Sequence, residues 1–210
     1  MNKLGDLSCK KFLTELASAA PAPGGGGGAA MAGALAAALA SMVANLTIGK
    51  EKFADREPEV KELLEQAEAE RVRLLTLVDE DAAVFNSFMS CYKLPKTTDE
   101  EKAARTAAIR AAAKQAATVP LNIARSSFAV LKLADRLVVS GNPGVITDGA
   151  CSGLLARAAL RCAEYNVRIN LGLTKDEAWN AQAAAELKQL LADAEALETR
   201  LLAVTDKALQ

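Results

Sequence analysis

The chain has 210 residues, of which 51% are hydrophobic but only 4% aromatic, and much of the apolar share is alanine. Alanine is the best helix former, whereas sheets favour branched and aromatic side chains, so the composition predicts an all-α domain and disfavours a β-sandwich. Lysine and arginine number 25 against 26 aspartates and glutamates, for a net charge of -1. This balance gives no support for nucleic-acid binding, which usually shows a strong basic excess.

Histidine is absent, and the four cysteines form no C-x-x-C pair; they are Cys9, Cys91, Cys151 and Cys162. A zinc site built from the usual histidine and cysteine ligands is therefore not expected. The cysteines are interpreted as reduced, mostly buried residues of a cytoplasmic protein. The N-terminus lacks the long apolar core of a secretion signal.

The first half of the chain predicts three helices. One spans residues 7–19 and ends at Pro21-Ala-Pro23, after which glycines 24–28 open a second helix of small residues. The uncharged stretch 29–46 reaches the lower edge of membrane-spanning length, about 18 residues. Because it lacks aromatic anchors, we expect a helix buried on all sides and no membrane insertion. Pro58 suits the first turn of a third helix that reaches about residue 91.

The second half predicts further helices with clear start signals. Thr98 and Glu101 form a capping box, and Pro120 is expected to break that helix and start another, which ends near residues 141–144. A long helix follows to about residue 171. Thr174 and Glu177 suggest a second capping box, with helix to near the C-terminus. Because no repeat or linker interrupts the pattern, residues 1–210 are predicted as one domain, a bundle of long helices.

The glycine run is the first place where chemistry could occur. Bare amides at a helix N-terminus attract anions, and missing side chains let a ligand approach the backbone. The run is not a Walker loop, because no Gly-Lys-Ser/Thr closes it, and no strand precedes it. A tightly packed turn between two helices explains the glycines equally well.

Asp81 is the second candidate. With about 100° per residue, it lies on the apolar face of its helix between Phe85 and Phe88, whereas Glu80 points away. An inward-facing carboxyl loses hydration and should have a raised pKa unless a cation compensates. That is the usual preparation of an acid/base residue, and the alternative is an aspartate buried in a salt bridge.

A polar stripe on the helix after Gly141 is the third candidate. Asp148, Asn166 and Asn170 share one line with apolar residues, opposite several arginines. Asp148 is equally well explained as a capping or dipole-favoured residue. It lies about 27 Å along the axis from Asn166, so the two share a pocket only if the helix bends or a second subunit contributes.

Lys50 and Lys52 follow the glycine-led helix. They could bind an anionic substrate or neutralise a carboxylate. Lysines after a helix more often only compensate its dipole, and that explanation stays open.

Ten motifs in order along nearly the whole chain carry a family resemblance. They are Phe12-Leu13, Pro21-Ala-Pro-Gly-Gly-Gly, Met42-Val43, Leu46-Thr-x-Gly49-Lys50, Asp81-x-x-x-Phe85, Leu94-Pro-Lys-x-Thr98, Glu101-Lys-x-x-Arg105, Val119-Pro-Leu121, Gly141-Asn142 with Asp148, and Asn166-Val-x-Ile-Asn170. Together they resemble the cyclodeaminase/cyclohydrolase family of folate enzymes. Pro143-Gly144, in the loop before Asp148, departs from what the family would show.

The resemblance implies an all-helical homodimer that uses no metal and no tightly bound cofactor, and whose substrate is a tetrahydrofolate derivative. It places the catalytic aspartate on Asp81 and the folate pocket beside Lys50 and the glycine run. The substrate-binding candidates are Pro23, Gly24, Gly25, Gly26, Gly27, Asn166 and Asn170.

The implied reaction is the hydrolysis of 5,10-methenyltetrahydrofolate to 10-formyltetrahydrofolate. A carboxylate can stabilise the cationic N–CH–N carbon, take a proton from the attacking water and return it to the departing nitrogen. Our hypothesis gives this role to Asp81, support of the cation or water to Asp148, and orientation or binding of a glutamate carboxylate to Lys50.

Three alternatives stay open at this stage. A formiminotetrahydrofolate cyclodeaminase would release ammonia through the same N–C–N carbon, and the missing formiminotransferase domain favours the cyclohydrolase over it. A non-catalytic folate-binding protein would bind without turnover. A purely structural bundle would show no folate-induced rise in melting temperature.

Overall fold

The computed structural model describes residues 3–210, which form six α-helices, three short 3-10 helices and no strand. The all-α prediction is confirmed. The helices are α1 (Cys9–Leu16), α2 (Gly25–Asn45), α3 (Glu57–Cys91), α4 (Asp99–Ser140), α5 (Ile146–Thr174) and α6 (Glu177–Ala208), and the 3-10 helices are Leu4–Asp6, Glu51–Phe53 and Pro143–Val145.

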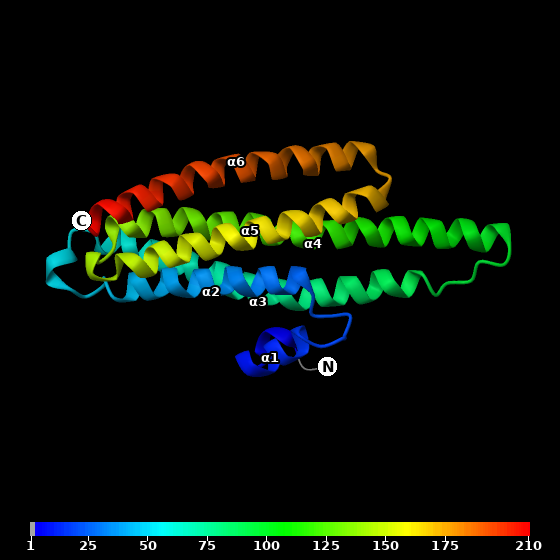
Figure 1. Ribbon diagram of the computed structural model, residues 1–210, viewed down its shortest axis with the longest axis horizontal. Coiled ribbons are helices and arrows are strands. Elements are labelled where there is room, and N and C mark those ends of the chain that lie inside the picture. Colours follow the sequence, from blue (N-terminus) through cyan, green and yellow to red (C-terminus); the bar gives the residue numbers. More distant parts are fainter. Residues whose placement is uncertain (1–2) are drawn as a thin grey trace.

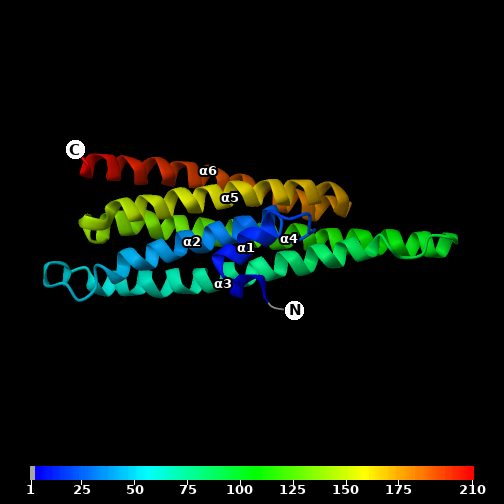
Figure 2. The same ribbon diagram turned by 60° about the horizontal axis from the view of Figure 1, so that its bottom comes forward.

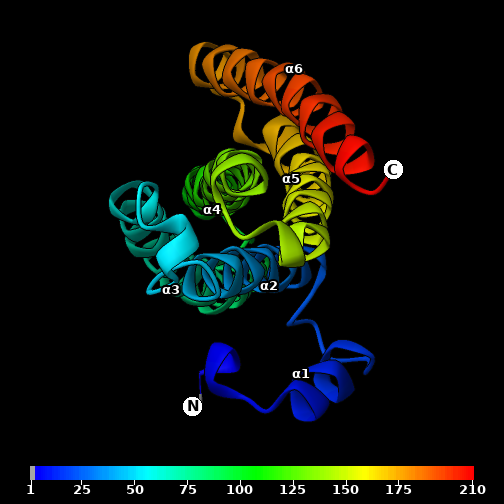
Figure 3. The same cartoon turned by 90° about the vertical axis from the view of Figure 1, so that its left-hand side faces the viewer.

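Helices α2 to α5 run lengthwise beside one another and form the body of the molecule (Figure 1). Contacts join α2 to α3, α3 to α4, α4 to α5 and α5 back to α2, which makes a closed four-helix ring. Helix α6 packs against the outside of α4 and α5, and α3 and α4 extend beyond the other helices at one end (Figure 2). Viewed along the bundle, α1 lies outside the ring, below α2 (Figure 3).

Helix α2 packs closely against α3 and α4 because its inward side is built from alanine and glycine. A Cβ at Gly33 would lie 3.0 Å from the side chain of Leu74 and 3.1 Å from that of Ser127. The helix is long and apolar enough to cross a membrane, and 61% of its most apolar window is buried inside the bundle. It is not buried on all sides, however: Leu35 and Met42 on its outer side are exposed.

The predicted break at Pro120 is wrong, because α4 runs unbroken from Asp99 to Ser140 with Pro120 inside it. The start of α4 is confirmed. The Thr98 hydroxyl accepts from the Glu101 N–H, and the Glu101 carboxylate accepts from the Thr98 N–H. A helix can contain proline if another donor satisfies the carbonyl one turn earlier.

The second predicted capping box is also wrong. Helix α5 continues to Thr174, and Asp176 is the N-cap of α6, where its carboxylate accepts from the Trp179 N–H at 3.1 Å. Lys175 between the two helices takes a left-handed conformation with φ of 56°. The Thr174 hydroxyl instead contacts Asn180.

The cysteines are free, but the expectation that most are buried is wrong. Cys9, Cys151 and Cys162 are exposed, and Cys91 is half-buried. Cys9 belongs to the short helix outside the ring, and the two on α5 lie on its outer side.

Candidate functional site

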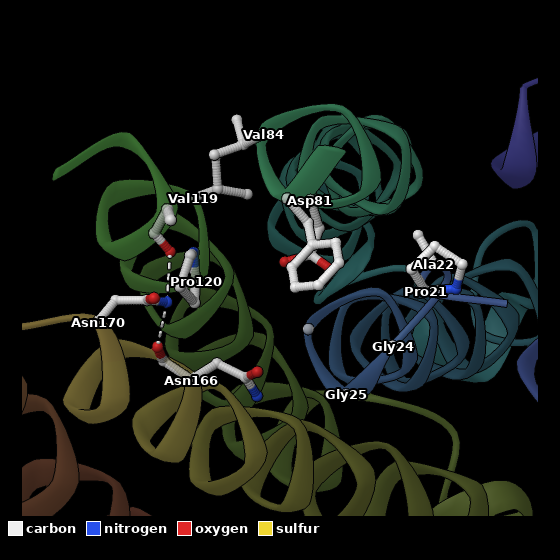
Figure 4. A pocket seen from close by; sticks show the side chains of 13 residues that line it. Pro21, Ala22, Gly24, Gly25, Asp81, Val84, Val119, Pro120, Asn166 and Asn170 are labelled. Carbon is white, nitrogen blue, oxygen red and sulfur yellow. Dashed lines mark hydrogen bonds between the residues drawn. The ribbon is translucent and has the colours of Figure 1, made fainter. Parts of the chain in front are cut away.

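A cavity of about 130 Å³ lies where α2 begins, between α3, α4 and α5 (Figure 4). It is open to solvent beside Pro21 and Phe85, both of which are exposed. Its walls come from the loop before α2, the first turn of α2, and one stretch each of α3, α4 and α5. The lining residues are Pro21, Ala22, Gly24, Gly25, Gly26, Asp81, Val84, Phe85, Ala116, Val119, Pro120, Asn166 and Asn170.

Asp81 is the only acidic residue of this lining. Burial raises the pKa of its carboxyl, and a hydrogen bond from the backbone N–H of Gly27 lowers it by less. Across the described residues 3–210, no lysine or arginine forms an ion pair with it and no neighbouring charge shifts its pKa. The inward orientation and raised pKa expected from the sequence are confirmed, and the salt-bridge alternative is not.

The glycine run forms the first turn of α2, with Gly24 as its N-cap. A Cβ at Gly26 would lie 2.6 Å from the carboxyl carbon of Asp81, so the carboxyl group lies directly against the bare helix backbone. Its hydrogen bond from Gly27 uses one of the N–H groups that have no partner within a helix N-terminus. The glycines therefore make room for Asp81. Pro23 is buried, packs against Gly27 and does not line the cavity.

Asn166 and Asn170 lie one turn apart on α5 and both line the cavity. The Asn170 side-chain nitrogen donates to the backbone carbonyl of Ala116 on α4 at 2.9 Å and to that of Asn166 at 2.8 Å (Figure 4). The Asn166 side-chain nitrogen donates to the carbonyl of Cys162 at 2.9 Å. These bonds fix both amides at the wall opposite Gly25 and Asp81.

Lys50 and Asp148 lie away from the cavity, at the end of the bundle where α2 ends and α5 begins (Figure 1). Asp148 is in the first turn of α5, about 27 Å along the axis from Asn166. Lys50 follows the C-terminal end of α2, whereas the cavity lies at the N-terminal end of the same helix (Figure 1). Neither side chain lines the cavity, so one copy of the chain does not bring them to Asp81.

A family model described as formiminotransferase-cyclodeaminase matches residues 8–189. The chain belongs to this family. A methenyltetrahydrofolate cyclohydrolase from Methylorubrum extorquens is 45% identical over 197 residues, which cover 94% of this chain and 95% of that protein.

Other members of the family are similar over the same region. A formimidoyltransferase-cyclodeaminase from Sus scrofa is 33% identical over 88% of this chain, and the match spans 34% of that longer protein. The solved structure of a formiminotetrahydrofolate cyclodeaminase from Thermotoga maritima is 30% identical and covers 98% of both chains, with a TM-score of 0.88.

Sequence reasoning missed the wall that α4 contributes. Ala116, Val119 and Pro120 line the cavity, whereas helix periodicity and proline chemistry predict only a helix break at Pro120. The Val119-Pro-Leu121 motif carried part of the resemblance to the formiminotransferase-cyclodeaminase family, and it was the available signal.

Proposed function

We propose that this protein is a methenyltetrahydrofolate cyclohydrolase. The observation that carries the proposal is the Asp81 carboxyl, which faces a cavity without a compensating cation and has a raised pKa. Such a group can both attract a cationic ligand and exchange a proton with it. The similarity to the Methylorubrum extorquens cyclohydrolase over 95% of its length supports this activity.

In the proposed reaction, Asp81 first stabilises the cationic bridge carbon of 5,10-methenyltetrahydrofolate. A water oxygen bonds to that carbon while its proton passes to the Asp81 carboxylate. The proton then moves to N5, the bond between the carbon and N5 breaks, and the hydroxyl proton of the adduct passes to solvent, which leaves the formyl group on N10. Acid–base help of this kind is typically worth ~10²–10⁴-fold in rate.

The other lining residues suit a ring system. Val84, Phe85, Val119 and Pro120 supply apolar surface. The volume of about 130 Å³ is below the roughly 300–1,000 Å³ of most ligand sites. We infer that the pterin end of the substrate enters the cavity and that the glutamate end stays outside it.

A second activity has specific support. The similar proteins from Sus scrofa and Thermotoga maritima are named as cyclodeaminases. Their reaction passes through the same N–C–N carbon, so Asp81 could serve it equally. Incubating the protein separately with 5,10-methenyltetrahydrofolate and 5-formiminotetrahydrofolate, and following methenyl absorbance and ammonia, distinguishes the two. Loss of methenyl absorbance beyond the uncatalysed rate, without ammonia from the formimino compound, supports the cyclohydrolase.

We also propose that the protein is a homodimer whose two copies meet along the outer sides of α2 and α5. These neighbouring helices expose several large apolar side chains there: Leu35, Met42, Leu154, Tyr165 and Ile169. Exposed apolar patches of this kind mark association surfaces. Two copies related by a two-fold axis across these helices run antiparallel. The end that holds Lys50 and Asp148 in one copy then lies near the Asp81 cavity of the other.

A further inference from the structure

Pro120 leaves one carbonyl of α4 without its helical partner. In an α-helix the N–H of residue 120 would donate to the carbonyl of Ala116, but proline has no N–H. Ala116 is half-buried and lines the cavity, and a carbonyl shielded from water needs another donor.

Asn170 supplies that donor from the neighbouring helix. Its amide nitrogen carries two hydrogens: one goes to the Ala116 carbonyl at 2.9 Å, and the other to the Asn166 carbonyl at 2.8 Å. Because both partners are acceptors, the nitrogen has to face them, and the amide oxygen cannot take its place. Asn170 can therefore offer a ligand in the cavity only its oxygen, an acceptor.

We propose that Pro120 is a positioning residue, which keeps the Ala116 carbonyl free so that Asn170 presents an acceptor to an N–H group of the ligand. The inference rests on the proposed function for the identity of that ligand: the edge of a tetrahydropterin ring carries N–H and amino donors. Pro120 forms part of the cavity wall but takes no part in the chemistry. Asn170 contributes to binding and selects ring edges that carry a donor.

This arrangement explains a proline in the middle of a long helix. With alanine at position 120, the restored N–H would compete for the Ala116 carbonyl, and the hydrogen bond from the Asn170 amide to that carbonyl would weaken. The helix would gain a hydrogen bond while the site lost its orientation. Stability and ligand affinity therefore change in opposite directions, which a purely structural proline would not produce.

The test compares Pro120→Ala with the matched control Thr118→Ala. The Thr118 hydroxyl donates to the Lys114 carbonyl in the same stretch of α4, but Thr118 does not line the cavity. For Pro120→Ala we expect KM for 5,10-methenyltetrahydrofolate to rise about five-fold, the effect of one weakened hydrogen bond. We expect kcat to be nearly unchanged, because the bond is made in both the bound and the transition state. The melting temperature should stay or rise.

A second readout does not depend on turnover. In the free protein, the side-chain NH₂ resonances of Asn170 in ¹⁵N-resolved NMR spectra should shift and lose protection from exchange in Pro120→Ala but not in Thr118→Ala. The Asn170 resonances are assigned by their disappearance in the variant Asn170→Leu. In that variant, KM for 5,10-methenyltetrahydrofolate should rise about ten-fold or more.

The outcomes separate this inference from the proposed function. Unchanged NH₂ resonances in Pro120→Ala overturn the inference, as does a rise in KM accompanied by a lower melting temperature. If the wild type turns over neither folate compound, the proposed function fails, and the NH₂ resonances still decide whether Pro120 positions Asn170.

Discussion

Gly26 in the first turn of α2 lies against the carboxyl group of Asp81 on α3, so that a Cβ at position 26 would be 2.6 Å from the carboxyl carbon. The closeness of a bare helix backbone to an acidic side chain links two motifs that are 55 positions apart in the sequence. It gives the glycine run a definite purpose, which is to leave space for the carboxyl group beside the cavity.

Gly26→Ala should therefore remove most activity. The added methyl group must displace the Asp81 carboxyl group, and small displacements of a catalytic group cost about 10²-fold in rate. The matched control is Gly28→Ala, in the same run and helix, where the nearest atom to an added Cβ is a Leu16 methyl carbon at 3.9 Å. Gly28→Ala should keep activity and gain stability from its better helix propensity, by up to about 1 kcal/mol. Equal activity of the two variants in the methenyl absorbance assay would argue against the role of Gly26.

The rate of hydrolysis should depend on the ionisation of Asp81. Because burial raises the pKa of this carboxyl, kcat/KM should fall with decreasing pH at a value above the 3.8 of an ordinary aspartate. The expected profile of kcat/KM has one acidic limb that Asp81→Asn abolishes. A profile that is flat from pH 4 to 7 in the wild type would contradict the assignment.

The same raised pKa predicts a pH-dependent stability. Below the ordinary value of 3.8, Asp81 is protonated in both states; above it, the unfolded chain releases the proton before the folded protein does. The free energy of unfolding therefore falls as the pH rises from 3.8 to the raised pKa of Asp81 in the folded protein. Urea denaturation should show that Asp81→Asn becomes more stable relative to wild type as the pH increases over this interval. A difference that does not change with pH would contradict the raised pKa.

If Lys50 acts across a dimer interface, two inactive variants should complement each other. Lys50→Ala and Asp81→Asn should each have little activity alone. Co-expression should give mixed dimers, in which one of the two cavities has an intact Asp81 and an intact Lys50 from the other copy. Random mixing then restores about a quarter of wild-type sites, since half of the dimers are mixed and each has one intact site. Light scattering measures the oligomeric state, and a monomer, or no recovered activity, would refute the proposed trans arrangement.

The capping box at the start of α4 should contribute to stability only. Thr98→Ala removes the hydroxyl that accepts from the Glu101 N–H, which should cost about 1 kcal/mol of unfolding free energy. Thr97→Ala is the control, because Thr97 contributes only its backbone N–H, which donates to the Glu101 carboxylate. Chemical denaturation measures both variants. An equal loss in the two would show that the hydroxyl of Thr98 contributes nothing specific.

The features that sequence predicted correctly depend on neighbours within one helix. The inward orientation of Asp81 followed from helical periodicity with Phe85 and Phe88, and the α4 capping box joins Thr98 to a residue three positions later. Helix periodicity also placed Asn166 and Asn170 on one side of α5, where both reach the cavity.

What the sequence did not predict depends on contacts between distant segments. Pro120 is compatible with an unbroken helix because Asn170 satisfies the Ala116 carbonyl from 54 residues away. The outer positions of Cys151 and Cys162 likewise depend on which side of α5 the other helices cover. Periodicity within one helix cannot show which neighbour will supply a donor or cover a face.

The central claim is that the carboxyl group of Asp81 performs the proton transfer, and Asp81→Asn tests it most directly. This variant keeps the size of the side chain and removes the base, so kcat for 5,10-methenyltetrahydrofolate should fall by ~10²–10⁴-fold, while circular dichroism and melting temperature show a folded protein. A folded Asp81→Asn protein that hydrolyses the substrate at nearly the wild-type rate would contradict the account.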